Sequence, residues 1–130
     1  MVACALSNAG DAAKQTAWVK QAWKQGDFRE DEEHRIIISY SDTLTKNDHH
    51  ARVERLLYEG KLPAAKRMIP QAPADRQKIY AVRMALISGD KKAPALLKTL
   101  SAAQQRDAGI LFDRAHWYMR RGNNSYADLV

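Results

Sequence analysis

The sequence predicts an all-α protein in which helix–turn–helix repeats stack into a right-handed α-superhelix of about eight helices. Gly26, Gly60, Gly89 and Gly122 each close an apolar helical segment, and they follow one another at intervals of 34, 29 and 33 residues. A period of about 30 to 34 residues with one helix-ending glycine per unit is typical of helical-repeat proteins. The residues three and four positions before each glycine are all apolar, which predicts that one face of each helix packs on a neighbour: Trp23 and Ala22, Leu57 and Leu56, Leu86 and Ala85, Met119 and Tyr118.

The helices can be placed one after another from the prolines and the apolar spacing. We expect them over residues 12–25, 29–41, 46–59, 62–69, 73–88, 92–99, 107–121 and 124–130. Pro63, Pro73 and Pro94 lie where helices begin, and Pro70 lies where one ends. Proline is tolerated in the first turn of a helix and disrupts its interior, so these positions agree with the predicted bounds.

Local signals support the individual helices. The three isoleucines at 36–38 favour a strand by their β-branching, but four acidic residues precede them where a first helical turn would lie, and no other segment offers a partner strand. We therefore predict a helix there. In the next helix, Thr45 and Asp48 have the spacing of a capping box. Ala65 follows Gly60 by five residues and is small enough for two helices to pack closely.

Two apolar stripes at helical spacing are predicted to face the core. One lies in the helix over 73–88 and the other in the helix over 107–121. The first consists of Ile79, Val82 and Leu86, and the second of Leu111, Ala115 and Tyr118, with Phe112 and Met119 beside them.

The net charge is +6, from 21 basic and 15 acidic residues, and it is unevenly distributed. Residues 27–35 hold five acids and two bases, so the rest of the chain carries +9. An excess of basic residues suits nucleic acid, an anionic lipid surface or an acidic polymer. The bases, Arg52, Arg55 and Arg83 among them, are scattered with no run longer than two, which is typical of solvated helix faces.

The sequence offers no recognisable reaction centre. Cys4 is the sole cysteine, which excludes a disulfide framework and a cysteine-built metal site. The four histidines lack the spacing of metal ligands, and we find neither a glycine-rich phosphate loop nor a nucleophile motif. No apolar run reaches the roughly 20 residues of a membrane span. We therefore expect no catalytic residue, no metal and no cofactor in this chain, and no membrane span.

One group of residues has the chemistry to contact a ligand. Trp117 is flanked by arginines, and aromatic rings interleaved with arginine suit a glycan or single-stranded nucleic acid. The candidate contact residues are Arg114, Trp117, Arg120 and Arg121. The competing interpretation is that at least two of the three tryptophans, Trp18, Trp23 and Trp117, pack in the core or between repeats. We expect no nucleic-acid partner, because the bases are not concentrated on one face and no nucleic-acid module is recognisable.

Two long blocks of the sequence resemble a known family. The blocks LTKNDHHARVERLLYEGKLPAAKRM, beginning at Leu44, and DAGILFDRAHWYMRRGNNSYADLV, beginning at Asp107, resemble the superhelical domain of soluble lytic murein transglycosylases of the α-proteobacterial branch. Tyr58 stands where that family usually has tryptophan. The resemblance implies a U-shaped or ring-like superhelix that precedes a lysozyme-like catalytic domain in a periplasmic enzyme.

The family cleaves the β-1,4 bond between N-acetylmuramic acid and N-acetylglucosamine without water and leaves a 1,6-anhydro end, using a glutamate followed by serine. This chain has no Glu-Ser pair, so no catalytic residue carries over. The resemblance implies that residues 1–130 are a non-catalytic scaffold fragment. Its partners would be peptidoglycan, the remaining superhelix and the catalytic domain of the same protein.

A tetratricopeptide-like solenoid that binds a protein partner remains the alternative. The period of about 30 to 34 residues supports it. The family pattern of that repeat is present only in part, in the segments AWKQG and LLYEG.

Overall fold

A computed structural model describes residues 9–120, and every regular element in that range is helical. The elements are α2 (Ala9–Gln25), α3 (Glu30–Ser39), α4 (Lys46–Tyr58), α5 (Leu62–Met68), 3₁₀ turns at Ile69–Gln71 and Ala74–Arg76, α6 (Gln77–Ser88), α7 (Ala93–Lys98), α8 (Ala102–Gln105) and α9 (Ala108–Arg120). The predicted all-α class is confirmed. The helix expected over 124–130, together with Gly122, lies outside the described residues.

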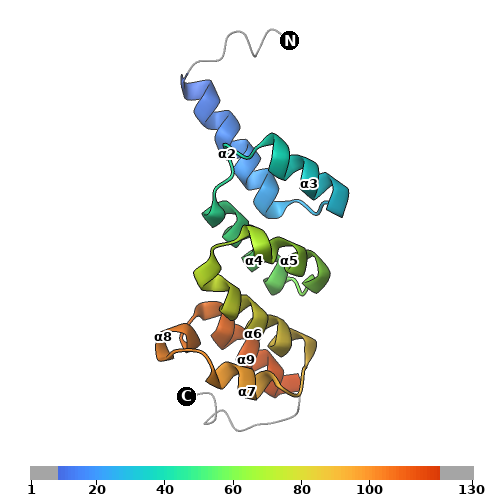
Figure 1. Cartoon of the computed structure of the whole chain (residues 1–130), viewed down its shortest axis with the longest axis vertical. Coiled ribbons are helices and arrows are strands. Elements are labelled where there is room, and N and C mark those ends of the chain that lie inside the picture. The colour runs from blue at the N-terminus through green and yellow to red at the C-terminus, as the bar shows by residue number, and fades with distance from the viewer. Residues whose placement is uncertain (1–8, 121–130) are drawn as a thin grey trace.

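The helices are arranged in successive layers along the long axis of the molecule (Figure 1). Helices α2 and α3 lie at one end, α4 and α5 in the middle, and α6 to α9 at the other end. Helix α2 packs on α4, α4 on α6, and α6 on α9, while α5 packs on α4 and α7 on α6. The long helices that precede the periodic glycines are therefore neighbours in space.

Two of the periodic glycines end their helices in the predicted way. Gly60 follows α4 with a φ of +72°, and Gly89 follows α6 with a φ of +76°. Only glycine adopts this left-handed conformation without strain. At both ends the next residue donates its backbone N–H across the turn, from Lys61 to the carbonyl of Leu56 at 2.8 Å and from Asp90 to that of Ala85 at 3.0 Å. This is the Schellman arrangement, which satisfies the last carbonyls of a helix.

Capping boxes fix the starts of two helices. Asp48 donates its backbone N–H to the Thr45 hydroxyl at 3.2 Å and accepts the Thr45 N–H on its carboxylate at 2.7 Å, so the predicted cap of α4 is confirmed. Ser101 and Gln104 make the same pair of bonds at the start of α8. We did not predict this one-turn helix, because four residues are too few to show a helical period.

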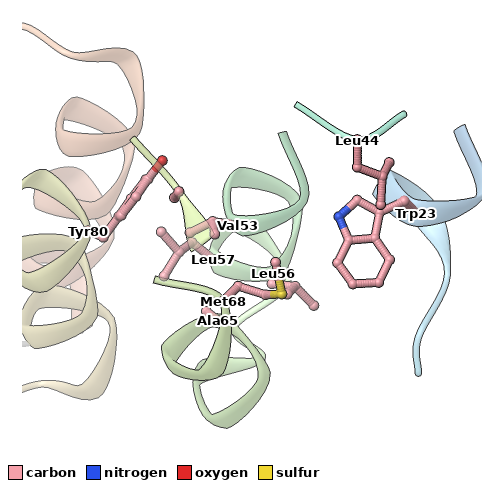
Figure 2. Close-up of a cluster of buried hydrophobic side chains, with 9 residues drawn as sticks. Trp23, Leu44, Val53, Leu56, Leu57, Ala65, Met68 and Tyr80 are labelled. Carbon is pink, nitrogen blue, oxygen red and sulfur yellow. The ribbon is translucent and has the colours of Figure 1, made fainter. Parts of the chain in front are cut away.

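The core consists of two clusters that share α6. The first contains Trp23, Val53, Leu56, Leu57 and Met68, with Tyr80 of α6 at its edge (Figure 2). The second is built on the opposite side of α6: its members are Ile79, Val82, Ala85, Leu86, Ala93, Leu100, Ile110 and Trp117. Burial on two sides is what a stack of layers requires of its inner helices, since each layer covers the next. The predicted stripe of Ile79, Val82 and Leu86 is confirmed.

The prediction for the apolar face of α9 is wrong. Leu111, Phe112 and Met119 are exposed, while Ala115 and Tyr118 are only half-buried. The buried residues of α9 are instead Gly109, Ile110, Asp113 and Trp117. The buried face of α9 therefore carries Ile110 and Trp117, which lie two turns apart, and it also brings the Asp113 carboxylate to a buried arginine of α6.

Candidate functional site

Arg83 connects three helices from inside the molecule. This α6 side chain has no exposed surface, and its Nε donates to Asp113 of α9 at 2.6 Å. Its Nη1 donates to Glu54 of α4 at 3.0 Å, and its guanidinium lies 4.6 Å from the centre of the Tyr58 ring. Burial raises the pKa of the Asp113 carboxyl, and the hydrogen bond from Arg83 opposes that shift. The network fixes α4, α6 and α9 relative to one another.

Arg52 has the same role in the preceding layers. It too is completely buried, and its Nη1 donates to the backbone carbonyls of Trp23 and Gly26, each at 2.6 Å. Its Nη2 donates to Glu33 of α3 at 3.0 Å, and Arg67 of α5 donates to the other oxygen of that carboxylate at 2.7 Å. Burial lowers the pKa of Arg52, and the Glu33 carboxylate opposes the shift. The expectation that the scattered arginines lie on solvated faces is therefore wrong for Arg52 and Arg83.

Two further arginines cap the C-terminal ends of neighbouring helices. Arg55 donates to the carbonyls of Lys24 and Gly26 at the end of α2, at 2.8 Å each. Arg120 donates to the carbonyls of residues 86 and 87 at the end of α6, at 2.6 and 2.8 Å. A cation at this end of a helix interacts favourably with the helix dipole and satisfies unpaired carbonyls.

The structure places the predicted contact residues in different environments. Trp117 is 8% exposed and belongs to the second core cluster, while Arg120 is engaged with the end of α6. Arg114 is half-buried on α9, and Arg121 lies outside the described residues. Trp23 is also buried and Trp18 is 76% exposed, so the interpretation that at least two tryptophans pack in the core is confirmed.

A small cleft opens where the ends of α4 and α6 meet α9. Its volume is about 230 Å³. Tyr58 and Phe112 line it with their ring centres 5.2 Å apart at an angle of 69°, and His116 lies 4.4 Å from Phe112. Glu59, Asp113 and Arg120 contribute polar groups to its walls. We call this site the aromatic cleft.

Sequence reasoning did not find the aromatic cleft. Phe112 and His116 are one helical turn apart, which places them on the same side of α9. Their spacing was the available signal, but Tyr58 lies on a different helix and far away in the chain. Only the packing of α4 and α6 against α9 brings the three rings together.

A wider cleft of about 740 Å³ lies between α3 and α5. Most of its lining side chains are ionised, and several are already paired with one another: Arg67 bonds Glu33 at 2.7 Å, and Arg35 lies 3.4 Å from Asp31. The Arg67–Glu33 contact joins α5 to α3, whereas the Arg35–Asp31 contact lies within α3, so these charges are engaged in the structure of the helices themselves.

The histidines of α4 take part in packing. His49 Nδ1 accepts a hydrogen bond from the indole Nε1 of Trp23 at 3.1 Å, while His50 bonds the hydroxyl of buried Tyr80 and lies 3.9 Å from Glu54. Burial lowers the pKa of both histidines, so the neutral imidazole is favoured in the folded state.

Within residues 9–120, no cluster of histidine, cysteine, aspartate and glutamate has the geometry to hold a metal ion. Nor does any helix in that range have the length and hydrophobicity to cross a bilayer.

Comparison with known proteins gives no relative: no family model matches the chain, and no curated protein or solved structure does either. The geometry alone therefore defines the class, which is an all-α protein of layered helices locked together by buried arginines.

Proposed function

We propose that this chain is a non-catalytic scaffold segment of the superhelical domain of a periplasmic lytic transglycosylase. In that role it supports peptidoglycan strands beside a catalytic domain of the same protein, which cleaves them to 1,6-anhydro products. The right-handed superhelix expected from the sequence belongs to the same proposal.

The observation that carries the proposal is the structural role of the first resembling block, which begins at Leu44. Thr45 and Asp48 cap α4, Arg52 joins the first layers, and Gly60 ends the helix in a left-handed conformation. Ala65, on α5, has no exposed surface and lets the two helices pack closely. The specific positions of this block therefore build a rigid helix pair, which supports a scaffold.

The state of the buried carboxylates also favours support over catalysis. A general acid in glycoside cleavage needs a carboxyl group whose pKa is raised by an apolar pocket. Glu33 accepts hydrogen bonds from two arginines, one on each oxygen, so both oxygens are engaged in joining the helices. Burial raises the pKa of Asp113, but its carboxylate is bonded to Arg83 at 2.6 Å and is only 3% exposed, so it is engaged in joining α6 to α9.

Exposed lysines supply a means of attracting the proposed partner. Lys66, Lys91 and Lys92 are exposed on α5 and at the start of α7. Peptidoglycan carries peptides with free carboxylates, which such lysines attract over roughly 10 Å at moderate ionic strength and less in high salt.

Sedimentation with purified cell-wall sacculi tests the proposal. We expect the chain to sediment with sacculi at low salt, to sediment less at high salt, and to release no 1,6-anhydro fragments by itself. A triple Lys66→Gln, Lys91→Gln, Lys92→Gln variant should bind less than a matched variant with arginine at the same positions. If the wild-type chain stays in the supernatant at low salt, the proposal is wrong.

The periodic stacking of long helices also favours a tetratricopeptide-like interaction solenoid as a second candidate. A pull-down that returns one stoichiometric protein partner, combined with no binding to sacculi, would support this second function.

A further inference from the structure

We propose that the aromatic cleft is a saccharide subsite that takes one sugar ring of a β-1,4-linked amino-sugar strand. The inference rests on the proposed function, because it names the surface on which the glycan lies. None of the contact residues predicted from the sequence, apart from Arg120, lines this cleft.

The first argument is the exposure of two large rings that meet. Tyr58 and Phe112 are each 44% exposed, although they contact one another across two helices. Apolar surface that a folded chain leaves exposed in a cleft is typical of binding sites. Aromatic rings present flat, polarised faces, and the C–H bonds on one side of a pyranose ring are the complementary surface.

The second argument is that the rings are held in place before any ligand arrives. The Tyr58 ring lies against the guanidinium of Arg83, which is itself fixed by hydrogen bonds to Asp113 and Glu54. Phe112 projects from α9 one turn before His116, and the two rings contact each other. A ligand that binds such a preorganised surface loses less conformational entropy in ordering it.

The third argument concerns charge. Glu59 is paired with Arg55 and Lys61 at 2.9 Å each, and Asp113 with Arg83 at 2.6 Å. Arg120 donates to the backbone carbonyls at the end of α6. Because these charges are already partnered, the cleft favours a neutral ligand over an ionic one. The remaining lone pairs of the carboxylates can accept hydrogen bonds from hydroxyl groups.

The size of the cleft limits the ligand. Pockets for drug-sized molecules have volumes of about 300 to 1,000 Å³, and this cleft has about 230 Å³. A single ring therefore fits inside, and the neighbouring sugars of a strand would lie on the adjoining surface of α9 and α4.

Titration with chitotetraose, a neutral β-1,4-linked N-acetylglucosamine tetramer, tests the inference. We expect amide shifts in NMR spectra at residues around Tyr58, Phe112 and His116. Phe112→Ala removes one of the two rings and should weaken binding about fivefold or more, by analogy with the loss of one ring that stacks on a nucleobase. Tyr58→Phe, which keeps the ring, should bind nearly as well as the wild type.

Trp18→Ala is the matched control, since it removes an exposed aromatic ring on α2, far along the stack from the cleft (Figure 1). It should leave the affinity unchanged. A thermal melt followed by circular dichroism checks that Phe112→Ala remains folded. The inference is wrong if the wild type does not bind chitotetraose, if Phe112→Ala binds equally well, or if a free stem peptide, but not chitotetraose, shifts the same amides.

The same variants separate this inference from the proposed function. If the wild type and Phe112→Ala sediment equally with sacculi and chitotetraose shifts no amide at the cleft, the saccharide site fails and the scaffold function stands. If chitotetraose binds in the ring-dependent way while the wild type does not sediment with sacculi, the site stands and the peptidoglycan scaffold fails.

Discussion

The guanidinium of Arg83 lies directly against the Cα of Gly109, so α6 and α9 are in close contact at their buried ion pair. A Cβ at position 109 would overlap the Arg83 side chain, which cannot move aside without leaving Asp113 and Glu54. We predict that Gly109→Ala lowers the free energy of unfolding by about 1 to 3 kcal/mol, although alanine favours helix by up to about 1 kcal/mol. Urea denaturation measures the change.

The matched control for that prediction is the double variant with Arg83→Met. Once the guanidinium is gone, the added methyl group has room, so Gly109→Ala should cost little in the Arg83→Met background. The two effects should therefore be strongly non-additive. Additive costs would contradict the proposed overlap.

Arg52 and Arg55 lie one helical turn apart on α4, and their side chains should contribute unequally to the free energy of unfolding. We expect Arg52→Met to lower the free energy of unfolding by about 3 to 5 kcal/mol, because it removes one partner of a buried ion pair. Arg55→Met should cost about 1 kcal/mol, because Arg55 is partly exposed and its carboxylate partners are solvated. Chemical denaturation of both variants tests this order, and equal costs would contradict it.

Most of the helices could be predicted because their signals are local. Proline at helix starts, glycine at helix ends and the Thr45–Asp48 cap each act within a few residues, and the predicted bounds lie close to the observed ones. The stacking could be anticipated from the glycine period. The buried face of α9 could not be predicted in this way, because the buried partner of Asp113 is Arg83, which lies on another helix.

The candidate site was less predictable than the helices, because it too depends on contacts between separate helices. Trp117 and its neighbouring arginines have the composition of a contact surface, but the indole is packed in the core and Arg120 caps α6. Tyr58 and Phe112 form the aromatic cleft only through the contact of separate helices. No pattern within either helix encodes that contact.

The free energy of unfolding should fall at acidic pH, and His49 should contribute to that fall. Burial lowers the pKa of His49 from its ordinary value of 6.5, so the unfolded chain binds more protons below that pH. The contribution of His49 to the free energy of unfolding should therefore be fully present above about pH 6.5. It should be lost as the pH is lowered towards the folded-state pKa. His50, whose pKa burial also lowers, adds an effect of the same sign.

His49→Gln isolates the contribution of His49, because glutamine can still accept the hydrogen bond from Trp23 but does not titrate. Urea denaturation between pH 7.5 and 5 should give a shallower decline for this variant than for the wild type. His34→Gln, at an exposed position on α3, is the control and should retain the wild-type decline. An unchanged slope in His49→Gln would show that His49 is not the group responsible.

Asp27 reports directly on the ion pairs that join the α2–α3 connection to α4 and the start of α5. Hydrogen bonds from Lys61 at 2.6 Å and Arg55 at 2.8 Å lower its pKa from 3.8 to about 2. Because the folded-state pKa is the lower one, the stabilisation is present above about pH 4 and is lost as the pH falls towards 2.

NMR titration of the Asp27 carboxyl carbon should give a midpoint of about 2. Lys61→Met should move that midpoint up towards 3.8, whereas Lys66→Met, on the exposed side of α5, should leave it in place. A midpoint near 3.8 in the wild type would mean that these pairs do not form in solution.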